Sequence, residues 1–451
     1  MVKYVQLPLI ETEAKKTNYQ GQVIETNGLG NRLAPEDRVF HDWYRFVLSY
    51  PAHLVSYYMS NFGLKKGQVV LDPFCGTGTT LVEAKRNGIN SIGVEANPIA
   101  HFASSVKVDW DVNPLHLTQI AQEVANQTLS ILAAQGIDDN KKSDPSLLQG
   151  QLRTLSDEQE RLILQDSISP LPLHKVLVLR DVLSTRQAER CYNHLCLALA
   201  KTIVFRVSNL HFGPEVGVEK PKADAPVIAS WLGEVQHIVK DISKVYNKEH
   251  PTSTVLLADA RNISQVIASL TIDAVITSPP YPNEKDYTRT TRLESVILGF
   301  VKNKEDLRHL KKTLVRSNTR GVYKEDDDDQ WSHKYPQINE IARAIENRRI
   351  ELGKTSGFER LYGRVTRLYF GGMARHLEDI RQTLHPGAQL AYVVGDQASY
   401  LRILIRTGQL LAEIATEIGY EVVRIDLFRT RFATSTKQEL REEVVILKWR
   451  G

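Results

Sequence analysis

A glycine-rich turn at Asp72–Thr80 (DPFCGTGTT) is the first stretch of this chain whose residue types point to ligand chemistry. It follows the apolar run Val69–Leu71 and precedes a helix-like segment. Glycines 76 and 78 let the backbone approach a ligand closely, and the helix start offers unpaired N–H groups. No Lys follows the glycines, so the turn is not a GxxxxGK[ST] phosphate loop, and it does not match GxGxxG. Alone, it fits either a ligand site or a structural turn.

Acidic residues close the neighbouring predicted strands. Glu95 ends the run Ile92–Val94, about 20 residues beyond the glycines, where an acid can bind both hydroxyls of a ribose. Asp259 ends a third run, where it can accept from an adenine amino group or cap a helix after Ala260. With Asp72, three acids stand at three successive strand ends. This pattern favours an adenosine-containing cofactor.

The turn Thr277-Ser278-Pro279-Pro280-Tyr281 follows the fourth predicted strand. Two successive prolines make the backbone rigid and remove two N–H donors, so its carbonyls serve as fixed acceptors. Ser278 adds a hydroxyl, and Tyr281 adds a flat ring. Acceptors beside a stacking face suit a flipped base held by its exocyclic amine. A proline-rich strand exit with a packing tyrosine is the alternative.

The apolar runs predict an α/β fold with a seven-stranded, doubly wound, Rossmann-like sheet. The expected strands cover 69–71, 92–94, 255–257, 273–276, 389–394, 421–427 and 443–449, the last two forming an antiparallel C-terminal hairpin at one edge. Residues 110–250 interrupt the alternation as a mostly helical insertion, with helical patterns at 117–134, 191–205 and 227–242. A second interruption covers 285–365, and His385-Pro386-Gly387 is expected to stop the helix that follows. Residues 1–40 are expected to form a loose arm.

Composition narrows the class of protein. The 451 residues carry a net charge of +4, with 42% hydrophobic and 24% charged residues, which excludes wholesale disorder. No window approaches the ~18 apolar residues of a membrane span. The N-terminal residues lack a secretory signal, three cysteines are too few for a disulfide framework, and the histidines show no metal spacing. We therefore expect a cytoplasmic protein without membrane contact or metal.

Together, the turn at Asp72, Glu95 and the Thr277–Tyr281 turn resemble the amino-methyltransferases that use S-adenosylmethionine. The TSPPY form resembles that of bacterial DNA cytosine-N4 methyltransferases, whereas adenine-N6 relatives more often have Asp or Asn in place of Ser278. Tyr50-Pro51-Ala52 resembles the family motif over the methionine end of the cofactor. The resemblance covers roughly 41–109, 254–290 and 370–449.

The resemblance implies a role for each matching residue. The cofactor S-adenosylmethionine is expected to be bound by Tyr50, Pro51, Asp72, Pro73, Phe74, Gly76, Gly78, Thr79, Glu95, Asn97 and Asp259. The catalytic residues are expected to be Ser278, Pro279, Pro280 and Tyr281, and the DNA contacts Arg289, Arg292, Arg429 and Arg431. The cofactor turn precedes the catalytic turn here, whereas many TSPPY enzymes have the reverse order, so the position of the sequence-reading segment stays open.

The resemblance implies a site-specific DNA methyltransferase that modifies the exocyclic amine of a flipped base, with cytosine N4 as the expected target. Its domains are then 41–109 with 251–451 for catalysis, 110–250 for target recognition, and 285–365 as a DNA-contacting segment. Expected partners are double-stranded DNA and a cognate restriction endonuclease, in the bacterial cytoplasm at the nucleoid. Adenine-N6 methylation, RNA guanine-N2 methylation and a non-catalytic DNA-binding protein are the alternatives.

Three further segments have an open function. Residues 302–320 carry seven Lys and Arg, which fit either phosphate contacts or a solvated helix face. The acidic run 325–329 is expected to be a solvent loop. The segment with Asn209, Phe212, Gly213 and Glu215 is a candidate contact to the base or flanking DNA.

Overall fold

A seven-stranded sheet carries the fold in the computed structural model, which describes residues 21–24, 35–44, 49–140, 152–213, 215–433 and 438–451. Its spatial order is β5 (Ser253–Leu257), β2 (Asn90–Glu95), β1 (Val69–Asp72), β6 (Ile272–Thr277), β7 (Leu384–Gly395), β9 (Gln438–Lys448) and β8 (Glu421–Ala433). The strands β5, β2, β1, β6 and β7 are parallel. The predicted α/β fold class is confirmed.

The last strand of the sequence does not lie at the edge of the sheet. β9 is inserted between β7 and β8 and runs antiparallel to both. The outer edge of β8 is covered by residues 21–24, where the Ile24 N–H donates to the Leu427 carbonyl at 3.0 Å. Gly21 is required there, because a Cβ would lie 1.6 Å from the carbonyl oxygen of Ile425. This pairing protects an edge that is otherwise open to other strands.

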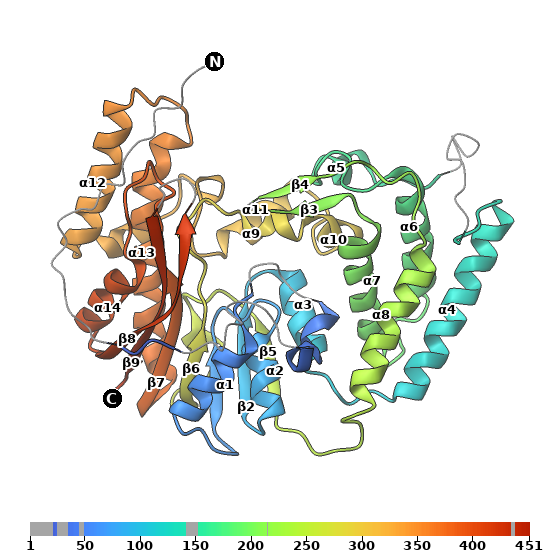
Figure 1. Ribbon diagram of the computed structural model, residues 1–451, viewed down its shortest axis with the longest axis horizontal. Coiled ribbons are helices and arrows are strands. Elements are labelled where there is room, and N and C mark those ends of the chain that lie inside the picture. Colours follow the sequence, from blue (N-terminus) through green and yellow to red (C-terminus); the bar gives the residue numbers. More distant parts are fainter. Residues whose placement is uncertain (1–20, 25–34, 45–48, 141–151, 214, 434–437) are drawn as a thin grey trace.

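Helices cover both faces of the sheet (Figure 1). Adjacent strand residues point to opposite faces, so Leu71 and Val275 pack with one set of helices, and Val70 and Ala274 with another. The first face is covered by α12 (Pro336–Glu351), α13 (Tyr362–Ile380) and α14 (Thr407–Ile418). The opposite face is covered by α1 (Ala52–Asn61). α2 (Thr79–Arg86) and α3 (Pro98–Lys107) pack toward the helical part of the molecule.

Residues 110–250 form a helical bundle with one small hairpin. Its elements are α4 (Pro114–Ala134), α5 (Asp157–Glu160), α6 (Pro170–Ser184), α7 (Tyr192–Thr202), η4 (Ile203–Val207), β3 (Leu210–Phe212), β4 (Val216–Val218) and α8 (Val227–Ile242). The three helices predicted here are present as α4, α7 and α8. α6 has no helical pattern in the sequence, because its residues 171–179 are buried all round and show no helical period.

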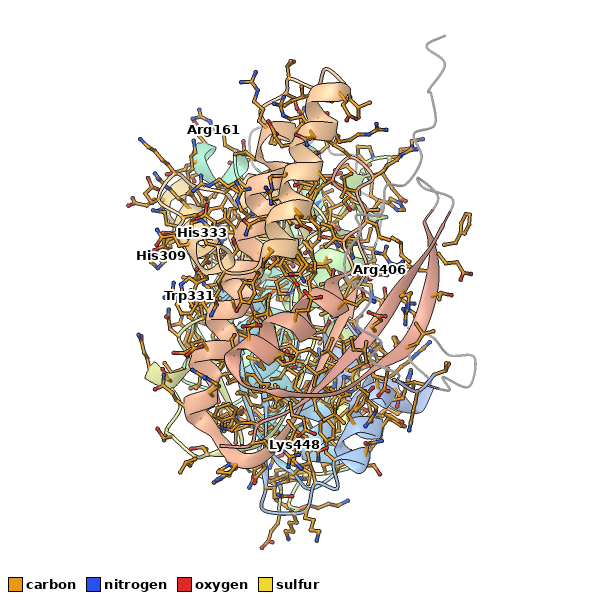
Figure 2. All side chains as sticks on the ribbon, turned by 90° about the vertical axis from the view of Figure 1, so that its left-hand side faces the viewer. Arg161, His309, Trp331, His333, Arg406 and Lys448 are labelled. Atoms are coloured by element: carbon orange, nitrogen blue, oxygen red, sulfur yellow. The ribbon has the colours of Figure 1, made fainter. Side chains whose placement is uncertain are left out.

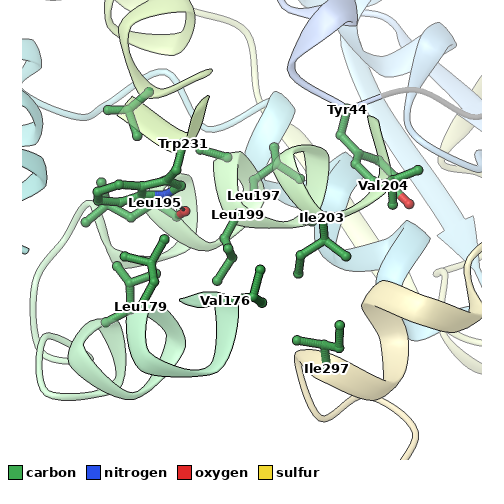
Figure 3. Close-up of a cluster of buried hydrophobic side chains, with 14 of the residues drawn as sticks. Tyr44, Val176, Leu179, Leu195, Leu197, Leu199, Ile203, Val204, Trp231 and Ile297 are labelled. Carbon is green, nitrogen blue, oxygen red and sulfur yellow. Dashed lines mark hydrogen bonds between the residues drawn. The ribbon is translucent and has the colours of Figure 1, made fainter. Parts of the chain in front are cut away.

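The bundle shares a core with the second interruption. Figure 3 shows Val176 of α6, Leu199 of α7 and Ile203 close to Ile297, which lies on α10 (Arg292–Ile297). A buried side chain from the segment that follows the Pro-Pro turn thus packs into the bundle. The position of that segment therefore depends on both parts of the chain.

The second interruption bridges the two ends of the molecule in Figure 1. Besides α10 it contains α9 (Tyr287–Thr290), α11 (Lys304–Lys312), η6 (Thr319–Gly321), η7 (Asp328–Ser332) and η8 (Glu359–Leu361). The remaining short helices are η1 (Pro35–Arg38), η2 (His41–Trp43), η5 (Ile263–Gln265) and η9 (Arg381–Thr383). Figure 2 labels His309, Trp331 and His333 from this bridge at one edge of the molecule.

Two sequence expectations are wrong in this region. The acidic run is not a solvent loop, because Asp328 is 2% exposed and Arg261 and Arg375 form ion pairs with it. The helix expected to stop at His385-Pro386-Gly387 ends at Ile380, and these three residues belong to β7. In both cases tertiary partners override the local signal.

Among the described residues, no helix is both long enough and apolar enough to cross a membrane. The described part of the chain also contains no group of three or more His, Cys, Asp or Glu side chains arranged for a metal ion. Of the predicted arm 1–40, residues 1–20 and 25–34 lie outside the described residues.

Candidate functional site

A cavity of about 490 Å³ opens at the carboxyl ends of β1, β2 and β6. In parallel α/β sheets this is where ligands bind. Many of the predicted site residues lie on its wall: Tyr50, Pro73, Phe74, Gly76, Thr79, Glu95, Asn97, Ser278, Pro279, Pro280, Tyr281, Arg429 and Arg431. The remaining ones lie off this wall: Pro51, Asp72, Gly78, Asp259, Arg289 and Arg292. One cavity thus joins the glycine-rich turn and the Pro-Pro turn.

Glu95 anchors one end of the cavity, which we call the cofactor end (residues 73–79 and 94–97). Its carboxylate accepts hydrogen bonds from the backbone N–H of Gly76 and of Asn97, both at 2.8 Å. Burial raises the pKa of Glu95 to about 7, although both N–H groups favour the ionised form. The glycine-rich turn and the second strand are thereby held together at one carboxylate.

Asp72 lies behind the wall and connects three segments. Its carboxylate is fully buried and accepts from the Tyr50 hydroxyl at 2.8 Å, the Thr277 hydroxyl at 2.6 Å and the Phe74 N–H at 3.1 Å. Burial raises the pKa of Asp72. These contacts link the Tyr50 segment and the Pro-Pro turn to the glycine-rich turn. The geometry therefore makes Asp72 a positioning residue.

Gly78 also acts behind the wall. It begins α2 with φ of 83°, and a Cβ there would lie 3.0 Å from the Cβ of Ser104. A larger residue would strain the backbone and push α3 away from the turn. Gly78 therefore shapes the cofactor end without facing the cavity.

The cofactor end has polar groups suited to a nucleoside ligand. Asn97 Oδ1 and Thr77 Oγ1 are buried, and neither has a hydrogen-bond partner among the described residues. Both residues line the cavity. A buried acceptor without a hydrogen bond lowers the stability of the folded protein, and a polar ligand can supply the missing bond. These polar groups fit S-adenosylmethionine, with the Glu95 carboxylate placed to accept from hydroxyl groups and apolar Phe74 and Val94 beside it.

The Pro-Pro turn forms the opposite end, which we call the substrate end (residues 278–287 with Arg429, Arg431 and Glu442). The Ser278 hydroxyl donates to the Val393 carbonyl at 3.2 Å, which leaves its lone pairs available as acceptors. The Tyr281 ring packs on Gly395, where a Cβ would lie 3.1 Å from Cε2. Burial and the Glu442 carboxylate raise the pKa of Tyr281, so this hydroxyl stays neutral.

Asp259 does not face the cavity. Its carboxylate forms an ion pair with Arg261 at 2.6 Å, and Arg261 also bonds to Asp328. Ala258 and Ala260, on either side of it, line the wall. No helix follows Ala260 directly, so Asp259 is not a helix cap. An adenine contact by Asp259 stays a prediction.

The four predicted DNA-contact arginines divide into two pairs. Arg429 and Arg431 line the cavity, and Glu442 lies 2.6 Å from Arg429 and 3.6 Å from Arg431. Arg292 instead donates to the carbonyl oxygens of Thr288 and Leu162. Arg289 lies 3.5 Å from Glu215. The first pair faces the candidate site, whereas the second is directed to other protein groups.

The segment 311–321 was not singled out as a cavity wall. Lys311, Arg316 and Asn318 line the cavity from this segment. The cations that face inward are ion-paired, Lys311 with Asp286 at 2.7 Å and Arg316 with Asp326 at 2.6 Å. In the sequence these lysines and arginines fit either phosphate contacts or a solvated helix face, because nothing local reveals the acids opposite.

The remaining candidates lie on or beside the β3–β4 hairpin. Asn209 is buried, and its amide bonds to the Asp166 carbonyl and the Lys222 N–H, so it fixes the hairpin. Phe212 ends β3, Gly213 follows it, and Glu215 lies within 4 Å of Arg289 and Arg320. The hairpin therefore meets the bridge between the two ends of the molecule. A base contact by these residues stays a prediction.

Comparisons with known proteins show what this chain is similar to. The DNA methylase family model matches residues 28–103, which contain the glycine-rich turn and Glu95. The type II methyltransferase M.BsoBI of Geobacillus stearothermophilus is 28% identical over 96% of this chain and 89% of its own length. M.AvaI of Nostoc sp., also a type II methyltransferase, is 22% identical over 90% of this chain and 84% of its own length.

A solved structure gives a weaker likeness. The crystal structure of TrmN from Thermus thermophilus aligns with 92% of this chain and 53% of its own length, at 10% identity and a TM-score of 0.30. A likeness at this level supports no conclusion about substrate.

The strand order and the cofactor end define a Rossmann-like methyltransferase that uses S-adenosylmethionine. Within that class, the chain is similar to DNA amino-methyltransferases, through the matched family model and the type II relatives.

Proposed function

We propose that this protein transfers a methyl group from S-adenosylmethionine to the exocyclic amine of a base in double-stranded DNA, with cytosine N4 as the target. The observation that carries the proposal is the single cavity shared by Glu95 and the Ser278–Tyr281 turn. A nucleoside held at one end and a base held at the other would meet within it. The type II methyltransferase relatives support DNA as the substrate.

The proposed role of Ser278 is to hold the target amine. Its hydroxyl proton is directed to the Val393 carbonyl, so its oxygen can accept a hydrogen bond from the amine. The Pro279 carbonyl is the second proposed acceptor. Two acceptors favour a pyramidal amine nitrogen, whose lone pair is then less delocalised into the ring. Fixed acceptors of this kind act through positioning and electrostatics.

Tyr281 is proposed to stack on the flipped base. Extruding a base costs a few kcal/mol, and stacking on an aromatic side chain returns about 1–3 kcal/mol. The raised pKa of Tyr281 excludes it as the base that removes the amine proton at neutral pH. Its contribution is therefore a surface for the base.

At the other end, Glu95, Asn97 and the Gly76 backbone are proposed to hold the cofactor. Bound S-adenosylmethionine would supply an activated methyl group, so no covalent protein nucleophile is needed. The three cysteines are buried, and burial raises the pKa of the Cys75 thiol. A role for a thiolate nucleophile, which cytosine-C5 methylation requires, is thus disfavoured.

The choice of base rests on Ser278. Adenine-N6 relatives more often carry Asp or Asn at this position, which supports cytosine N4 here, with adenine N6 as the second candidate. We further propose that 41–109 and 251–451 form the catalytic domain and that 110–250 contributes to recognition of the target sequence. The type II relatives support a cognate restriction endonuclease as partner, and a DNA substrate supports action at the nucleoid in the cytoplasm.

The proposal is tested by identifying the product. The purified full chain is incubated with labelled S-adenosylmethionine and either unmethylated DNA or bulk tRNA, and modified nucleosides are identified by chromatography and mass spectrometry. N4-methylcytosine in DNA is the expected result. N6-methyladenine in DNA would show that the target base is adenine. Label found only in tRNA would show that the substrate is RNA. Cofactor binding without methylation of DNA or tRNA would refute the proposal.

A further inference from the structure

The cavity wall carries five basic side chains, and one of them differs from the rest. Lys311, Arg316, Arg429 and Arg431 each lie within 4 Å of a carboxylate, at Asp286, Asp326 and, for both Arg429 and Arg431, Glu442. The side chain of Lys285 has no ion-pair or hydrogen-bond partner among the residues that the structure describes, yet it lines the same cavity. An unneutralised ammonium in a partly buried wall suggests an anionic ligand.

The backbone that carries Lys285 is held in an uncommon conformation. Glu284 has φ of 65°, in the left-handed region that a residue with a side chain rarely adopts. Its carboxylate accepts from the Thr319 N–H at 3.0 Å and the Thr319 hydroxyl at 2.8 Å. Such strain persists only where the surroundings impose it, and it concentrates at functional sites.

A second anchor acts on Lys285 itself. The Asn318 side-chain amide donates to the Lys285 carbonyl at 3.1 Å, and Asn318 is 8% exposed. The Glu284 N–H donates to the Ser317 carbonyl at 3.3 Å. The neighbouring segment 317–319 thus fixes both residues at the turn. The Lys285 ammonium is therefore presented to the cavity by a rigid backbone.

The electrostatic surroundings place Lys285 at the substrate end. Burial lowers its pKa, and the Arg431 guanidinium lowers it further, while Glu442 and Glu215 raise it. Arg431 and Glu442 belong to the substrate end, which also contains Lys285 itself. Lys285 follows Tyr281 by four positions, so its ligand lies close to the proposed base site.

We infer that Lys285 binds a backbone phosphate of the target DNA strand next to the flipped nucleotide. The inference rests on the proposed function. A phosphate is the anion that DNA brings beside every base, and a lysine binds it as a point charge without reading the sequence. A negative partner also offsets the burial of the ammonium and its repulsion from Arg431.

The first test measures how DNA binding depends on salt, using a duplex that contains the methylated site mapped in the product assay. Each phosphate contact contributes about 0.9 to the slope of log K against log salt concentration. Lys285→Gln is expected to reduce that slope by about one and to raise KM for DNA, with unchanged binding of S-adenosylmethionine. Lys285→Arg should retain the slope.

Lys66→Gln is the matched control. Lys66 is exposed and precedes β1, so it lies at the amino ends of the strands, opposite the cavity. Removing its charge should leave the salt slope unchanged.

The second test locates the phosphate. Phosphates on either side of the target nucleotide are replaced one at a time by neutral methylphosphonates. One replacement should weaken binding by the wild-type protein to the same degree as Lys285→Gln, and should have no further effect on Lys285→Gln. An unchanged salt slope in Lys285→Gln, or equal losses in both proteins at every position, would overturn the inference.

The two proposals fail in distinguishable ways. If the wild-type protein methylates no DNA, the proposed function fails before any comparison of variants. If it methylates DNA and Lys285→Gln matches it in slope and KM, only the phosphate contact is refuted.

Discussion

The two ends of the cavity are built in different ways. At the cofactor end, residues from 73–79 and 94–97 line the wall, and backbone N–H groups fix the central carboxylate of Glu95. At the substrate end, side chains from residues 278–287 meet Arg429, Arg431 and Glu442, beside the segment 311–321, and most of these charges are paired with one another. Local backbone geometry makes the first end, whereas tertiary packing makes the second. Mutations at the two ends should therefore separate cofactor binding from methyl transfer.

Ser278→Ala should give the largest effect. Loss of a fixed acceptor at the reacting amine is expected to lower the rate of methyl transfer by about 100–1,000-fold. Tyr281→Ala should lower the rate of transfer by about 5–150-fold, because it removes about 1–3 kcal/mol of base stacking. Single-turnover assays give the rate, and calorimetry should show nearly unchanged binding of S-adenosylmethionine. Full activity in Ser278→Ala would remove the catalytic assignment.

Glu95→Ala should have the opposite profile. It leaves the N–H groups of Gly76 and Asn97 without their acceptor, which costs about 1–3 kcal/mol, and it removes the proposed ribose contact. Affinity for S-adenosylmethionine is expected to fall by about 10–100-fold, whereas the rate at saturating cofactor falls less. A loss of rate with intact affinity would contradict the division between the two ends.

The affinity for S-adenosylmethionine should also depend on pH, through Glu95 at the cofactor end. The pKa of Glu95 is raised to about 7, so its ionised fraction falls below neutral pH. If the carboxylate form binds the cofactor, affinity should drop by about tenfold from pH 8 to pH 6. In Glu95→Gln, titration calorimetry should find this dependence flattened.

The folding stability of the protein without cofactor should fall as pH rises, whereas its affinity for the cofactor rises. A raised pKa in the folded state means that folding favours the neutral carboxyl. The stabilisation from Glu95 is therefore present below pH 4.5 and is lost as pH rises through about 7. Glu95→Gln should reduce the loss of stability between pH 5 and pH 8 measured by denaturant unfolding.

Gly395→Ala should have the smallest effect. Its Cβ would lie 3.1 Å from the Tyr281 ring and 3.3 Å from Glu442, so these groups must shift by a few tenths of an ångström. The rate of transfer is expected to fall by about threefold to tenfold, with cofactor affinity unchanged. Gly233→Ala in α8 is the control, because its Cβ meets open space, and it should stabilise the helix by about 0.5–1 kcal/mol.

The same contrast explains what could be predicted from sequence. The strands and the glycine-rich turn are continuous stretches, so apolar runs and glycine spacing were sufficient to locate them. Glu95 is the last residue of its strand, and the structure places it on the cavity wall. The positions of such residues depend on neighbours in the chain, which the sequence displays.

The substrate end and the bridge depend on partners far away in the chain. Asp328 is buried because Arg261 and Arg375 reach it, and no local pattern indicates those pairs. Arg292 follows the Pro-Pro turn closely, yet its guanidinium donates to the Leu162 carbonyl of the bundle. Lys285 resembles an ordinary solvent lysine in the sequence. Its significance emerges only when the four paired cations around it are seen.

The position of β9 between β7 and β8 has a consequence for synthesis of the protein. β8 leaves the ribosome before β9, and until β9 arrives its partner among the described residues is the short segment 21–24 at its outer edge. Glu442, which orients Arg429 and Arg431, is carried by this last strand. The nascent chain therefore assembles its cofactor end first and acquires a complete substrate end only when the final strand is inserted. A chain that is still being synthesised therefore lacks a complete substrate end.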